Sequence, residues 1–120
     1  MTEPAAWWPE VRRAVGSLYT GDEGDPLMMR LIYLGRWFTD HVGEFSEDQR
    51  RDLLALMERV AVDGSEDEVS AVLTGFVEAM LSAWDRGFDL RSIWHLVGPR
   101  QREYAKDWNE FNGIESPDWM

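Results

Sequence analysis

Apolar residues recur at three- and four-residue intervals along nearly the whole of this chain, which is the spacing of amphipathic helices. The alternation of apolar and polar residues that marks a strand is absent, and β-branched residues are few. A length of 120 residues is enough for one domain and leaves no room for a second core. The sequence therefore predicts an all-α fold in which residues 1–120 form a single helical domain of about five to six helices.

Capping and turn signals divide this pattern into segments. Ser46 and Ser65 each stand three residues before a Gln or a Glu, which is the capping box that begins a helix. Pro26 and Pro99 are placed to open helices, and Gly87 is placed to end one. The segments that we expect to be helical are 5–19, 26–44, 47–63, 66–86, 89–96 and 99–111, with an irregular tail at about 114–120.

The connections between the first four predicted helices are short, so we expect these helices to run up and down. The last predicted helix carries Tyr104, Trp108 and Phe111 at helical spacing. We expect these three rings to lie on one face and to pack the helix against the bundle.

Glu78 falls between apolar positions of the fourth predicted helix. A carboxylate that is buried there needs a partner, because an unpaired buried charge is costly. The sequence offers Arg100 and Arg102 as candidates for that partner.

Tryptophans in the terminal segments fit either the core or an interface. Trp7, Trp8 and Trp119 lie where burial is not assured, and exposed aromatic residues there would mark a binding surface. Packing onto the bundle is the favoured interpretation.

For His95, beside a tryptophan, we expect a half-buried ring that is bonded to the backbone.

Acidic residues outnumber basic ones by 23 to 12, which gives a formal net charge of −11. A surface of this sign repels phosphate, so the balance argues against binding of nucleic acid or an anionic membrane.

The chain has no cysteine, which excludes disulfides, Cys-type zinc sites and thiol catalysis. Eleven of the twelve bases are arginine, a bias that hints at a GC-rich bacterial genome.

No catalytic or metal-binding constellation is visible in the sequence. Neither His41 nor His95 has a Glu three residues before it, as the metal-carboxylate helical bundles require. The acidic segment 22–25 lacks the calcium-loop pattern, and no Gly-rich phosphate cradle occurs. We therefore expect a protein that is not an enzyme and that has no cofactor and no metal.

The start of the chain is acidic and lacks the basic start and apolar core of a signal peptide. Apolar stretches end well short of the ~20 residues that a membrane span needs. The sequence therefore predicts a cytoplasmic protein.

Acidic residues gather in two segments, the loop at 21–25 and the turn at 63–68. An up-and-down bundle brings these two segments to the same end. Neither segment contains a base, so we expect this end, the acidic pole, to be strongly negative and the opposite end to be mixed. The predicted partner-binding residues of the acidic pole are Asp22, Glu23, Asp25, Asp63, Glu66, Asp67 and Glu68.

Several segments resemble a family of small helical, largely uncharacterised bacterial proteins, some of which resemble immunity proteins of polymorphic toxin systems. The resemblance covers residues of about 30–114. It implies a helical fold and a partner-binding role, and it carries over no catalytic residue. The residues that carry it are Tyr33-Leu34-Gly35, Leu56-Met57-Glu58-Arg59, Thr74-Gly75-Phe76-Val77-Glu78-Ala79, the run 96–104 that includes Gly98-Pro99, and Trp108-Asn109-Glu110-Phe111-Asn112-Gly113.

Three hypotheses for function follow. The leading one is a non-catalytic acidic protein that occludes a basic partner, specifically an immunity protein for a basic toxin. The second is a structural or adaptor module that self-associates, as a homodimer, through its aromatic residues. The third is a phage-type inhibitor that mimics nucleic acid. Beside these three stands the interpretation that the acids serve only for solubility and helix capping.

Overall fold

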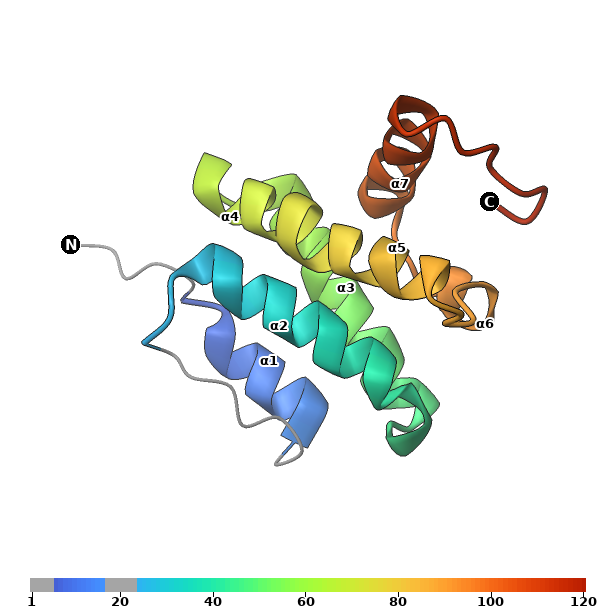
Figure 1. Cartoon of the computed structure of the whole chain (residues 1–120). Helices are drawn as coiled ribbons and strands as arrows, with labels where there is room; N and C mark the ends of the chain where they lie inside the picture. The colour runs from blue at the N-terminus through green and yellow to red at the C-terminus, as the bar shows by residue number, and fades with distance from the viewer. Residues whose placement is uncertain (1–5, 17–23) are drawn as a thin grey trace.

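The computed structural model describes residues 6–16 and 24–120, and it confirms an all-α fold (Figure 1). The described ranges contain no strand. Among the described helices, none has both the length and the apolar character needed to cross a membrane. The elements are α1 (Trp8–Val15), α2 (Leu27–Asp40), the 3-10 turn η2 (Val42–Glu44), α3 (Glu47–Asp63), α4 (Glu66–Ser70), the π-helical segment η3 (Ala71–Val77), α5 (Glu78–Asp85), α6 (Arg91–Trp94) and α7 (Pro99–Phe111).

Both predicted capping boxes are present. The Ser46 hydroxyl accepts from the backbone N–H of Gln49 at 3.1 Å, and the Gln49 side chain accepts from the Ser46 N–H at 2.9 Å. Ser65 and Glu68 make the same reciprocal pair at 3.2 and 2.9 Å. These local bonds begin α3 and α4 at the residues that the sequence indicates.

The centre of the molecule is the contact between α2 and the continuous helix formed by α4, η3 and α5 (Figure 1). Gly35 of α2 faces this helix so closely that an added Cβ would lie 2.8 Å from the Cβ of Ala79 and 2.9 Å from the carbonyl oxygen of Phe76. Leu31, Leu34 and Phe38 of α2 are fully buried beside it. A glycine at position 35 is therefore a packing requirement of the core.

The prediction of an up-and-down order fails for α1. Its first turn lies near the start of α2, where the Arg30 guanidinium sits 5.1 Å from the Trp8 ring centre, whereas Gly16 at its end lies near Gln49 of α3. Thus α1 and α2 both run opposite to α3 and parallel to each other. Residues 16–26 connect the end of α1 to the start of α2. These eleven residues are long enough to span α1, which is about 12 Å in length.

A carboxylate from α3 holds the start of α7. Glu58 accepts from the backbone N–H of Arg100 at 2.7 Å and from that of Gln101 at 3.1 Å. The Gln101 side chain, which is fully buried, donates to Glu58 and to the carbonyl oxygen of Leu54, each at 3.2 Å. Because first-turn N–H groups have no partner within their own helix, Glu58 serves as the N-terminal cap of α7, to residues that stand 42 and 43 positions later in the sequence.

Gly98 is what lets the carboxylate come this close. An added Cβ at position 98 would lie 2.3 Å from the carboxyl carbon of Glu58. The backbone of Gly98 is extended, with φ −75° and ψ 166°, which any residue can adopt. The requirement for glycine at this position is therefore the space that Glu58 fills.

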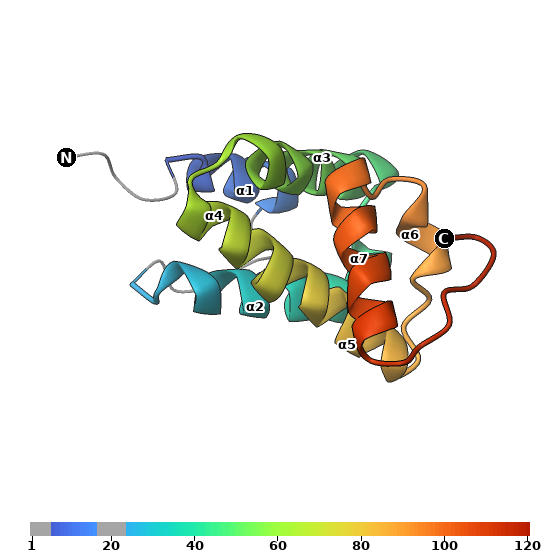
Figure 2. The same cartoon turned by 90° about the horizontal axis from the view of Figure 1, so that it is seen from above.

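The predicted aromatic face of α7 is only partly right. Tyr104 and Trp108 are half-buried against the bundle, but the Phe111 side chain is 89% exposed. The face that α7 buries is formed by Gln101, Ala105 and Asn109, because the Glu58 cap sets the rotation of the helix. Phe111 is the last residue of α7, which crosses the other helices (Figure 2).

The arginine partner that we expect for a buried Glu78 is not needed, because Glu78 is only half-buried. Its carboxylate accepts a hydrogen bond from the Tyr104 hydroxyl. Arg102 instead donates to the carbonyl oxygens of Val97 and Trp94, both at 2.7 Å. The backbone N–H of Arg100 is held by Glu58, as described above.

The terminal tryptophans pack onto the bundle, as the favoured interpretation predicts. Trp8 is 3% exposed, and Trp7 is half-buried beside it. Trp119, in the irregular tail, meets Trp84 and Trp94 edge-on, with ring centres 5.7 Å apart in both pairs. The tail is therefore fastened across α5 and α6 by three indole rings.

The Glu58–Gly98 contact predicts the effect of two matched substitutions. Gly98→Ala should lower the free energy of unfolding by about 1–3 kcal/mol, because the new methyl group displaces the Glu58 carboxylate. Gly43→Ala, at a position with no atom within 4 Å of an added Cβ, should change it by less than about 0.5 kcal/mol. Urea unfolding of both variants checks this, and equal midpoints for the two would contradict the proposed cap.

Candidate partner-binding surface

Five of the seven acids of the predicted acidic pole lie in the part of the chain that the structure describes. Asp22 and Glu23 lie outside it. Asp25 precedes α2, and the other four surround the turn between α3 and α4 (Figure 1). The Trp7 indole donates to Glu68, and Arg30 of α2 lies over Trp8, so the first turns of α1, α2 and α4 share one end of the bundle.

These five acids differ in how available they are. Asp63, Glu66 and Asp67 are exposed, and their side chains make no hydrogen bond or ion pair with any described residue. Both carboxylate oxygens of Glu68 are used, one by the N–H of Ser65 and the other by the Trp7 indole. Asp63, Glu66 and Asp67 are therefore the carboxylates that this end presents to a partner.

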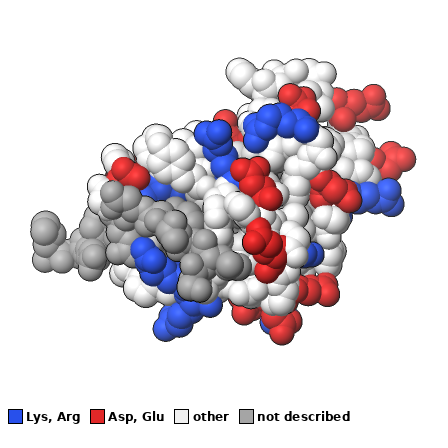
Figure 3. All heavy atoms as spheres, turned by 60° about the horizontal axis from the view of Figure 1, so that its bottom comes forward, with Lys and Arg blue, Asp and Glu red and all other residues white. Residues whose placement is uncertain are grey.

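The end is not negative on every side. Arg30 lies over the Trp8 ring, and Arg59 lines the hollow that reaches Asp63, so two basic side chains also lie toward this end. On the face drawn in Figure 3, acidic side chains are more numerous in the right half, on the side away from the α3–α4 turn, and basic side chains lie in both halves. The exposed carboxylates Asp63, Glu66 and Asp67 therefore have basic side chains at the same end of the bundle.

At the opposite end, charges of both signs pair with each other. Arg51 lies 3.0 Å from Asp48 and 3.3 Å from Asp52. His41 lies 2.5 Å from Glu44. These pairs are exposed, so each contributes little to stability, but they reduce the field that the carboxylates project.

His95 differs from its prediction. The ring is 60% exposed and is not bonded to the backbone. Its Nε2 lies 3.4 Å from a carboxylate oxygen of Glu47, at the start of α3. The short helix α6 ends at Trp94, which is buried, so the next side chain points outward.

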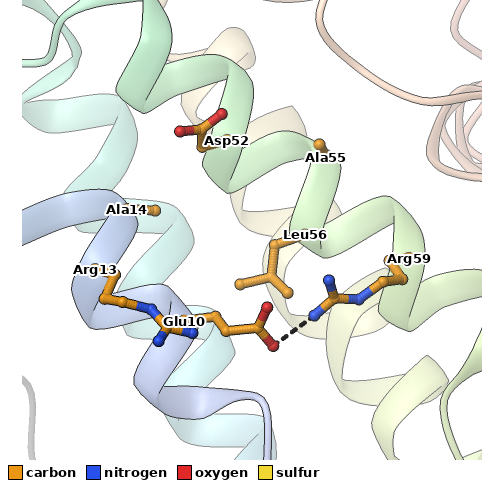
Figure 4. Close-up of a pocket in the computed structure, with 7 residues that line it drawn as sticks. All are labelled: Glu10, Arg13, Ala14, Asp52, Ala55, Leu56 and Arg59. Atoms are coloured by element: carbon orange, nitrogen blue, oxygen red, sulfur yellow. Dashed lines mark hydrogen bonds and ion pairs between the residues drawn. The ribbon is translucent and has the colours of Figure 1, made fainter.

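A groove runs along the seam between α1 and α3 (Figure 4). Ala14 and Ala55 are too small to fill the space between the helices, and the buried Leu56 forms part of the floor. The Arg59 guanidinium reaches across to Glu10 at 2.5 Å and closes one end (Figure 4). The hollow has a volume of about 480 Å³, and its other lining residues are Arg13 and Asp52.

A second hollow of about 390 Å³ continues beyond the Glu10–Arg59 pair. It shares these two residues with the first and reaches Trp7, Asp63 and Glu68. The two hollows together form an open trough that leads from the middle of α3 to the acidic pole. Within the described residues, no group of three or more His, Cys, Asp or Glu side chains is placed to hold a metal ion.

Sequence reasoning did not find this trough. The contact between α1 and α3 depends on the direction of α1, which the sequence analysis predicted wrongly. The signal that could have found it is the pair of alanines, Ala14 and Ala55, at positions where two amphipathic helices meet.

A third hollow lies beside α7, where the pKa of Tyr104 departs from its ordinary value. Burial raises the pKa of the Tyr104 hydroxyl above 10.0, and its hydrogen bond to the Glu78 carboxylate raises it further. The Tyr104 oxygen also lies 3.5 Å from the hydroxyl of Thr74. This arrangement holds Tyr104 as a neutral hydrogen-bond donor.

No protein-family model, curated protein or solved structure matches this chain. The resemblance to small bacterial immunity-type proteins, carried by segments such as 96–104, therefore stays a prediction. The chain is an all-α fold with three open hollows and with exposed carboxylates at the α3–α4 turn.

The two roles of the acids at the α3–α4 turn can be separated by mutation. Glu68→Ala should lower the free energy of unfolding by about 1–2 kcal/mol, because it removes half of a capping box and the acceptor of the Trp7 indole. Asp63→Asn should change it by less than about 0.5 kcal/mol. The check is urea unfolding, and an effect of Glu68→Ala no larger than that of Asp63→Asn would contradict the structural role of Glu68.

The raised pKa of Tyr104 predicts a pH dependence. As the pH rises through 10.0, the unfolded chain loses its Tyr104 proton before the folded protein does. The stability contributed by this group is therefore complete below pH 10.0 and is lost as the pH passes through the raised pKa. The advantage of the wild type over Tyr104→Phe should shrink in that window, and the variant should lack the late component of the tyrosinate absorbance titration. A titration that keeps this component in the variant would contradict the assignment.

Proposed function

We propose that this chain is a non-catalytic acidic binding protein of the cytoplasm, and specifically an immunity protein that occludes a basic toxin effector. The observation that carries the proposal is the set of three exposed carboxylates without described partners at the α3–α4 turn, Asp63, Glu66 and Asp67, of which Asp63 also lines the trough. Clustered carboxylates accelerate encounter with a cationic partner. The resemblance noted in the sequence agrees with this function.

The trough supports docking rather than chemistry. Its facing charges, Glu10 and Arg59, are paired with each other at 2.5 Å. Neither histidine is among the residues that line the two hollows. An open trough with a half-buried tryptophan and paired charges fits a protein surface better than it fits a small substrate.

An alternative is self-association through aromatic residues, which the exposure of Phe111 favours. It predicts a dimer whose formation depends little on salt. An inhibitor that mimics nucleic acid would use the same carboxylates and would differ from the leading proposal only in its target.

A matched pair of triple variants tests the leading proposal. Asp63→Asn, Glu66→Gln and Asp67→Asn together neutralise the available carboxylates and leave Glu68 in place. Asp40→Asn, Asp85→Asn and Asp89→Asn make the same change in charge at exposed positions of the opposite end. The partner is obtained by capture from the native host at low salt and release at high salt, and association rates are then measured by stopped flow.

We expect the first triple variant to slow association by about three- to tenfold at low ionic strength and to flatten its salt dependence. The second should associate within about twofold of the wild type. Equal rates for both triple variants would show that the acidic pole is not the binding surface. Recovery of this chain alone would favour self-association.

A further inference from the structure

The hollow beside α7 combines aromatic rings with carboxylates. It has a volume of about 470 Å³ and lies between α7 and the first turn of α5. Its lining residues are Glu78, Tyr104, Asp107, Trp108, Phe111 and Asn112.

The aromatic side of this hollow is open to solvent. Phe111 is 89% exposed, although its ring is wholly apolar, and Trp108 and Tyr104 are half-buried one and two turns before it. Of these three aromatic side chains, Tyr104 has its polar atom hydrogen-bonded within the hollow, because its hydroxyl donates to Glu78. A large exposed ring beside two others is a feature of binding surfaces.

The charge of the hollow has one sign. Glu78 and Asp107 line it, and no Lys or Arg does. The Asp107 carboxylate is exposed and makes no hydrogen bond or ion pair with any residue in the described ranges. Arg100, one turn before Tyr104, lies 3.6 Å from Glu103 and so has a partner of its own on α7.

We propose that this hollow is a socket for an arginine side chain of a partner protein. A guanidinium is planar, so it can stack on the rings of Phe111 and Trp108 while its N–H groups donate to the Asp107 carboxylate. Glu78, held by Tyr104, adds negative charge at the inner side. Arginine fits better than lysine because it offers both a flat face and several donors.

The socket does not depend on the acidic pole. It lies on α7 and α5, whereas the acidic pole lies at the α3–α4 turn, and no residue lines both. A partner could use the socket even if the carboxylates of the acidic pole served only for solubility.

A peptide titration observed by NMR tests the socket directly. The probe is Ac-Gly-Arg-Gly-amide, and its neutral isostere with citrulline in place of arginine is the control. The indole N–H signal of Trp108, assigned by its loss in Trp108→Phe, is the reporter. We expect a saturable shift with a millimolar dissociation constant for the arginine peptide and no saturable shift for citrulline.

Two substitutions locate the binding. Phe111→Ala and Asp107→Asn should each raise the dissociation constant by about two- to fivefold, and neither should unfold the protein because both side chains are exposed. Tyr33→Ala and Asp85→Asn, at exposed positions of α2 and α5, are matched controls and should leave it unchanged. Saturable binding of the citrulline peptide, or an unchanged constant in the Phe111→Ala, Asp107→Asn double variant, would overturn the proposal. So would a concentration-dependent dimer that Phe111→Ala abolishes, since the occupant would then be a second copy of the chain.

Discussion

The contact of the Glu58 carboxylate with the first turn of α7 decides how the last third of the chain sits on the rest. Two backbone N–H groups and the buried Gln101 amide converge on this one side chain, and Gly98 leaves the space for it. The contact fixes the rotation of α7, so that its small and polar residues face the bundle. The aromatic edge of α7 is therefore left open, and a structural bond within the core creates the proposed arginine socket.

Charge and shape act together at the other end of the molecule. The parallel direction of α1 and α2 brings Trp7 to the α3–α4 turn, where Glu68 is held and its neighbours Glu66 and Asp67 are left exposed. The same arrangement opens the trough between α1 and α3. Capping a helix and, in the proposed function, attracting a partner thus fall to different carboxylates of a single turn.

Features that depend on neighbours in the sequence could be predicted, and features that depend on distant contacts could not. The capping boxes at Ser46 and Ser65 were readable because both partners lie within three residues. The exposure of Phe111 was missed because the rotation of α7 is set by Glu58, more than 40 residues earlier. The direction of α1 and the π-helical segment η3 depend on tertiary packing, which residue periodicity does not record.

Amide hydrogen exchange at Arg100 and Gln101 tests the role of Glu58 most directly. First-turn amides of a helix have no acceptor in their own helix, so they exchange rapidly unless another group caps them. The structure predicts that these two amides are protected about as well as those in the middle of α7. Exchange of Arg100 and Gln101 as fast as that of an uncapped first turn would contradict the account, because α7 would then be held by something other than this carboxylate.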